Sequence, residues 1–193
     1  MVHGRFIKPK TLVVIQNHVM KNRTEEIEKS IMRNHDNKLK KLLKEAVLEN
    51  DTSILAILKN AIETEQTNGA IISETTKAYF RLKRKNIHDC SPLFELMNID
   101  VYIVQESLLD VLGYDKVIPS LEEQKTIIEK YYDFGAGIDL KYYSDPRYGL
   151  AAACAGWDFD VVEQFLKNCI TIKDVPLQYV AENSLKKKYV RLR

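Results

Sequence analysis

Histidine and cysteine are the residues best suited to metal binding or nucleophilic catalysis, and this chain spreads them widely. The histidines are His3, His18, His35 and His88. No two of them are four residues apart, so no helix can present two to one metal ion. The three cysteines form no C-x-x-C pair, and their odd number argues against a disulfide framework. We therefore expect no catalytic residues, no bound metal and no other cofactor.

One short motif keeps a catalytic alternative open. The spacing Asp139-Leu140-Lys141 resembles the aspartate-x-lysine motif of one family of metal-dependent nucleases. The same form recurs at 36–38 and, with glutamate, at 123–125, so composition alone can produce it. In that family the motif also lies on a strand of a mixed sheet, whereas this chain reads as helical. A metal-dependent nuclease is therefore the second alternative, and the chain is not expected to be an enzyme.

Basic residues gather in three clusters, at 38–44, 81–85 and 186–193. The last two fall where a helix is expected to end, and there lysine and arginine complement the helix dipole. Nucleic-acid binding would require the clusters to converge on one face, with aromatic rings such as Tyr79, Phe80 and Tyr189 available for stacking. A nucleic-acid-binding helical protein is the first alternative.

Aromatic residues are concentrated between 131 and 157, around a connection at 133–144 that is long for a helical domain. Tyrosine, tryptophan and arginine carry most of the binding energy in protein interfaces. We therefore expect a surface that binds another protein, although some of these rings could instead fill the core between helices. The binding surface is expected to include Tyr142, Tyr143, Arg147, Tyr148 and Trp157, with Tyr131 and Tyr132 as supporting residues.

Short helices joined by short loops are expected to position these residues. Apolar residues recur at three- and four-residue spacing from Thr24 onward, which is typical of amphipathic helices. Ser120 and Glu123 have the spacing of a capping box, and Gly113 is expected to end a helix. The predicted class is all-α. Residues 1–22 are expected to form an extended arm, with a strand at 11–15, and residues 23–193 a single helical domain.

Residues 150–168, LAAACAGWDFDVVEQFLKN, resemble the helix-turn-helix of an ankyrin repeat. Ala151–Ala153 correspond to its alanine-rich first helix, Gly156 to its turn, and Asp160-Val161-Val162 to the opening of its second helix. Residues 42–61 match more loosely. The resemblance implies stacked helical hairpins and a protein-binding role. A plain helical bundle is the alternative fold, because periodicity does not separate the two.

Bulk composition limits the class of protein and its expected cellular location. The chain has 193 residues, a formal net charge of +2 and 45% hydrophobic residues, which predicts a globular protein without general attraction to nucleic acid or membranes. Apolar runs fall short of a membrane span, so we expect a cytoplasmic or nuclear protein with no membrane partner. The abundance of lysine, asparagine and isoleucine, with eroded repeats, resembles small proteins of large DNA viruses or intracellular bacteria that intercept host signalling.

Overall fold

The structure is a computed structural model that describes residues 22–27, 29, 36–49, 53–63, 69–136 and 145–191. These residues form helices joined by turns, with no strand among them, so the all-α prediction is confirmed. The strand expected at 11–15, with nearly all of the predicted N-terminal arm, lies outside the described residues. No helix in the described ranges is long and apolar enough to cross a membrane.

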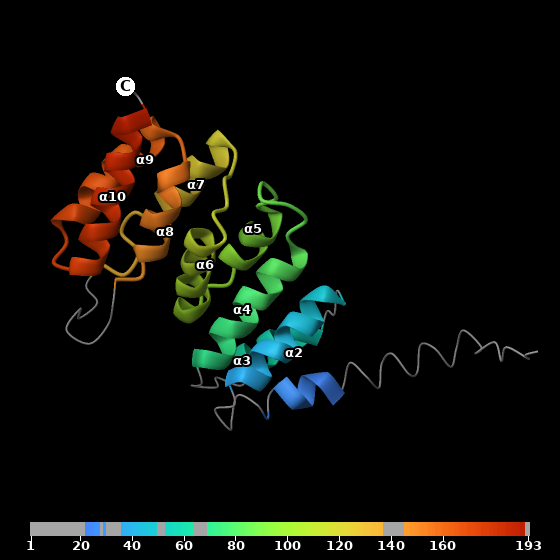
Figure 1. The fold of residues 1–193 in the computed structure, drawn as a ribbon. Helices are drawn as coiled ribbons and strands as arrows, with labels where there is room; N and C mark the ends of the chain where they lie inside the picture. Colours follow the sequence, from blue (N-terminus) through green and yellow to red (C-terminus); the bar gives the residue numbers. More distant parts are fainter. Residues whose placement is uncertain are drawn as a thin grey trace, which may run out of the picture. The chain divides into compact units, whose positions relative to one another are not determined.

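The chain divides into two compact units, Met1–Leu82 and Lys83–Arg193 (Figure 1). The sequence had suggested one helical domain over 23–193. Each unit contains its own set of fully buried apolar side chains, for example Ile54 and Leu58 in the first and Leu108 and Phe165 in the second.

Three helices of the first unit are α2 (Asp36–Leu48), α3 (Ser53–Glu63) and α4 (Gly69–Lys83), the last of which ends at the boundary. On α3, the residues Ile54, Leu58 and Ala61 are almost completely buried. Their three- and four-residue spacing places them on one face, as expected for an amphipathic helix. On α4, the buried Thr76 hydroxyl donates to the Ile72 carbonyl at 2.7 Å, which satisfies a polar group inside the unit.

The second unit contains six α-helices and one short 3₁₀ helix within the described residues. They are α5 (Ser91–Met97), α6 (Tyr102–Tyr114), α7 (Leu121–Tyr131), α8 (Tyr148–Ala153), η1 (Cys154–Gly156), α9 (Phe159–Thr171) and α10 (Val175–Arg191). α6 packs against α5 and α8, and α9 packs against α7 and α10 (Figure 1). α10 also contacts α8 and η1, so α8 has neighbours in both α6 and α10.

Polar residues fix where several of these helices begin. The predicted capping box is present: the Glu123 amide donates to Ser120 Oγ at 3.4 Å, and Glu123 Oε2 accepts from the Ser120 amide at 2.8 Å. Asp158 caps α9, because its side chain accepts from the Asp160 amide at 3.0 Å. Asp174 does the same for α10 by accepting from the Leu177 amide at 2.7 Å. These caps satisfy amides that have no partner within their own helix.

Candidate functional site

Helices α6 and α8 approach each other closely at two glycines, Gly113 and Gly149. A Cβ on Gly113 would lie only 2.5 Å from the Gly149 carbonyl oxygen, and a Cβ on Gly149 would collide with the Leu109 carbonyl. The two helix backbones therefore touch directly, which only glycine permits. The prediction that Gly113 ends its helix is wrong, because α6 continues to Tyr114 and its C-cap is Asp115. Gly113 is needed instead for the approach of α8.

A groove of about 160 Å³ lies at this crossing. We call it the α6–α8 groove. The residues that line it are Asp110, Gly113, Tyr114, Tyr148, Gly149 and Ala152. Each helix contributes one tyrosine, and both rings are accessible: Tyr114 is 77% exposed and Tyr148 is 43% exposed. Since glycine and alanine supply much of the lining, space remains between the two aromatic side chains.

One acidic residue and the ends of two helices lie at the α6–α8 groove. Asp110 is a half-buried residue of the lining and makes an interaction within the chain. The groove lies at the C-terminal end of α6 and at the N-terminal end of α8, so the partial charges of the two helix dipoles have opposite signs there. Just beyond the helix end, Asp115 pairs with Arg84 at 3.4 Å, so the charge of that arginine is offset locally.

The same face of α6 extends away from the groove. Tyr102, Glu106, Asp110 and Tyr114 recur every fourth residue and therefore share one stripe of the helix. The Tyr102 ring stacks on Phe134, with centroids 5.3 Å apart and planes 19° apart. Burial, followed by the nearby Glu106 and Asp145, raises the pKa of Tyr102 to about 12, so its phenol stays neutral.

Two rings of the predicted aromatic surface belong to the core instead. Tyr131 is 0% exposed, and its hydroxyl donates to Gln105 Oε1. Trp157 is 2% exposed, and its indole N–H donates to the Val117 carbonyl at 2.8 Å. Both rings have their polar atom satisfied inside the unit, as buried tyrosine and tryptophan usually do. The expectation that Trp157 lies on an exposed surface is therefore wrong, and Tyr131, expected to support that surface, is a core residue.

Arg147 is also an interior residue, at 4% exposure. Its guanidinium binds Asp145 in a bidentate manner, with Nε–Oδ1 at 2.9 Å and Nη2–Oδ2 at 2.7 Å. Nη1 donates to the Tyr132 carbonyl at 2.9 Å, and the Asp145 amide donates to Asp174 Oδ2 at 3.1 Å. Arg147 therefore links the segment before α8 to the end of α7, and its partner Asp145 links the same segment to the start of α10.

Three predicted residues remain to be placed. Tyr132 is half-buried, and its ring meets Phe165 edge-on at 6.2 Å. Tyr142 and Tyr143 lie outside the described residues. Tyr148 is thus the predicted residue that the structure places in an accessible groove. Sequence reasoning missed its partner Tyr114 and Asp110, although their four-residue spacing on an amphipathic helix was a readable signal.

Several residues of the basic clusters form ion pairs within the chain. Lys38 approaches Glu26 at 3.5 Å, Lys41 approaches Glu45 at 3.9 Å, and Lys186 approaches Glu182 at 3.5 Å. Two of the rings expected to stack on bases, Tyr79 and Phe80, are only 5% and 0% exposed. The described residues thus add no support to nucleic-acid binding, which stays a prediction.

The described residues give no further support to a metal site or to a reactive thiol. Within these ranges, no group of three or more histidine, cysteine, aspartate or glutamate side chains could hold a metal ion. The Asp139–Lys141 motif lies outside them. All three cysteines are buried, and burial raises the pKa of Cys90 and Cys169 to about 12. These thiols therefore stay protonated and are poor nucleophiles at neutral pH.

In comparisons with known proteins, no family model matches the chain, and neither a curated protein nor a solved structure matches it. Function is therefore inferred from the geometry of the α6–α8 groove.

Proposed function

We propose that this chain is a non-catalytic protein-interaction module and that it binds its partner through the α6–α8 groove. The observation that carries the proposal is the pair of accessible tyrosines, Tyr114 and Tyr148, at a groove formed where two helices touch through glycine. Tyrosine is enriched among the residues that dominate binding energy, especially where a side chain of the partner enters a pocket.

The support beneath the groove favours binding without rearrangement. Tyr148 directly follows Arg147, whose bidentate pair with Asp145 holds the start of α8 in place. Leu109 and Leu150, adjacent to the groove residues in sequence, are both 0% exposed. Because the helices that carry the tyrosines are fixed by packing, little ordering entropy is lost when a partner binds.

The resemblance of residues 150–168 to an ankyrin repeat agrees with this proposal. These residues form most of α8, all of η1 and much of α9, in the order helix, turn and helix. Ankyrin repeats act as protein-binding scaffolds, so a divergent relative would bind a protein too. We further propose that the partner is a cellular or host signalling protein in the cytoplasm or nucleus.

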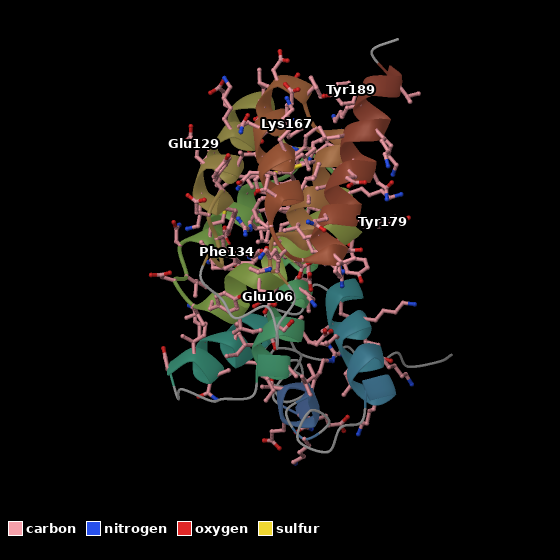
Figure 2. The ribbon with its side chains drawn as sticks, turned by 90° about the vertical axis from the view of Figure 1, so that its left-hand side faces the viewer. Glu106, Glu129, Phe134, Lys167, Tyr179 and Tyr189 are labelled. Atoms are coloured by element: carbon pink, nitrogen blue, oxygen red, sulfur yellow. The ribbon has the colours of Figure 1, made fainter. Side chains whose placement is uncertain are left out.

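Affinity capture from cell lysate tests the proposal. Tagged wild-type chain is compared with Tyr114→Ala and Tyr148→Ala, with and without nuclease, and retained proteins are identified by mass spectrometry. Tyr179→Ala is the matched control, because Tyr179 is 69% exposed on α10 and does not line the groove (Figure 2).

We expect one or two proteins to survive nuclease treatment with the wild type and the Tyr179→Ala variant. Both groove variants should lose them, since truncating a central interface tyrosine costs about 2 kcal/mol or more. Equal capture by all four chains would refute the groove as the binding site. Capture that disappears with nuclease would favour nucleic-acid binding.

A further inference from the structure

We propose that Asp174 and Ser184 are positioning residues for the α6–α8 groove: they set the place of its α8 wall and so control partner affinity without lining the groove themselves. This inference rests on the proposed function and adds the residues that fix the geometry of the binding site. It follows from two hydrogen bonds, one at the start and one in the middle of α10, that hold the two ends of α8.

The first bond lies at the start of α10, where Asp174 is 8% exposed. Its carboxylate uses its two oxygens for two different segments. Oδ1 accepts from the Leu177 amide at 2.7 Å and caps α10. Oδ2 accepts from the Asp145 amide at 3.1 Å. One side chain therefore fixes the segment before α8 to the first turn of α10.

Asp145 passes this constraint on to Tyr148, the groove tyrosine at the start of α8. The Asp145 carbonyl accepts from the Tyr148 amide at 3.2 Å, and Asp145 Oδ1 accepts from the Arg147 amide at 2.9 Å. Asp145 and Arg147 are only 2% and 4% exposed, so water has little access to these bonds. The backbone of Tyr148 is thus bonded to the residue that Asp174 holds.

The second bond holds the other end of α8. Ser184, at 3% exposure on α10, donates its hydroxyl to the Ala151 carbonyl at 2.8 Å. Ala151 is fully buried and directly precedes Ala152, which lines the groove. Because α10 packs against α8 and is bonded to both of its ends, α8 cannot turn freely on α10 (Figure 1).

The groove is sensitive to the place of α8 because its other side leaves no free space. The backbones of α6 and α8 touch at Gly113 and Gly149, so α8 cannot move closer to α6 without a collision. Close-packed interiors transmit small displacements rather than absorb them. A loosened bond to α10 therefore changes the crossing and, with it, the separation of the two groove tyrosines.

Asp174→Ser tests the first bond. Serine is as good an N-cap as aspartate, so it keeps the bond to the Leu177 amide, but its single, shorter oxygen cannot also reach the Asp145 amide. Asp158→Ser is the matched control, because Asp158 caps α9 by accepting from the Asp160 amide at 3.0 Å within its own first turn.

Ser184→Ala tests the second bond by removing one hydroxyl group. Its matched control is Ser107→Ala. Ser107 is also buried, at 1% exposure, but its hydroxyl donates to the Ile103 carbonyl of the same helix at 2.6 Å. Both changes remove a buried serine hydroxyl, and only Ser184→Ala removes a bond between two helices.

Amide spectra of the ¹⁵N-labelled full-length chain give a readout that needs no partner. We expect the Gly113 and Gly149 resonances to shift in Asp174→Ser and in Ser184→Ala, and to shift far less in the two controls. Gly113 lies on α6, so its shift reports the crossing rather than a lost cap on α10. The Asp145 amide should lose at least about tenfold of its protection from hydrogen exchange in Asp174→Ser.

Binding supplies the second readout. The proteins retained in the capture experiment are titrated against each variant, and urea unfolding is measured in parallel. We expect both positioning variants to bind more weakly by a factor of roughly two to thirty, the range for residues that act through an intervening network. A role in stability alone would lower the free energy of unfolding and leave the affinity of the folded chain unchanged.

Three results would overturn the inference: unshifted Gly113 and Gly149 resonances in both positioning variants, equal shifts in the matched controls, and unchanged affinity in the folded variants. If Asp174→Ser does not fold, Ser184→Ala decides alone, because alanine favours the helix. The two proposals also fail separately. A wild-type chain that captures nothing contradicts the proposed function, whereas a captured partner that binds both variants fully contradicts the positioning role.

Discussion

At the scale of single residues, burial decides which of the chemically distinctive side chains serve the fold. Arg147 has the hydrogen-bonding capacity of an interface residue, yet its donors are directed to Asp145 and to the Tyr132 carbonyl. Its neighbour Tyr148 is 43% exposed. The sequence places both residues in one aromatic segment, and only the packing of α7, α8 and α10 around them separates their roles.

Replacing Arg147 should destabilise the second unit strongly. Arg147→Ala leaves the carboxylate of Asp145, which is 2% exposed, without its charge partner. Breaking a buried ion pair from one side typically costs about 3–5 kcal/mol of unfolding free energy. Urea unfolding measures the loss. Lys187→Ala, at an exposed position on α10, should change the stability by no more than about 0.5 kcal/mol. A loss below about 1 kcal/mol for Arg147→Ala would contradict the structural role.

The buried cysteines predict a loss of stability in alkaline solution. Burial raises the pKa of Cys169 from its ordinary value of 9.0 to about 12. Below pH 9 the thiol is protonated in both the folded and unfolded chains, so stability is unaffected. Between these two values only the unfolded chain ionises, and the free energy of unfolding falls as pH rises. One such group contributes at most about 1.4 kcal/mol per pH unit.

A variant separates this contribution from other alkaline effects. Urea titration at a series of pH values from neutral to about pH 11 measures the free energy of unfolding of both chains. We expect this free energy to fall less steeply with rising pH in Cys169→Ala than in the wild type. The smaller side chain also changes the free energy of unfolding at neutral pH, but this constant difference does not alter the slope of that free energy with pH. Parallel slopes for the two chains would show that Cys169 ionises equally in both states.

At the scale of elements, the crossing of α6 and α8 depends on the absence of two side chains. Gly149→Ala introduces a methyl group against the Leu109 carbonyl, which is backbone and cannot rotate away. Overpacking of this kind costs about 1–3 kcal/mol. Gly156→Ala is the matched control, because its nearest neighbour is the flexible Ile118 side chain at 3.8 Å. Thermal or urea unfolding should show a clear loss for the first variant and little change for the second.

Local sequence signals predicted helix starts better than helix contacts. The capping box at Ser120 and Glu123 was predictable because its two partners are three residues apart. The role of Gly113 was not, because it depends on Gly149, which lies 36 residues away in sequence. For the same reason the concentration of aromatic residues was visible in the sequence, whereas the inward direction of Tyr131 and Trp157 was not.

At the scale of the whole molecule, the all-α class followed from periodicity and from the low glycine and proline content, 7 and 5 residues. The division into two compact units did not follow, since 193 residues fit one domain equally well. The boundary falls inside the last turn of α4, where neither a linker composition nor a break in periodicity marks it.

The burial of Trp157 gives the chain an intrinsic optical probe. It is the single tryptophan of the sequence and lies in the second unit at 2% exposure. Its emission should be blue-shifted in the native state and move to longer wavelength when water reaches the indole. Circular dichroism in the far ultraviolet, in contrast, measures helix in both units. The two signals, recorded on one unlabelled sample, therefore distinguish the opening of residues 83–193 from the melting of the entire chain.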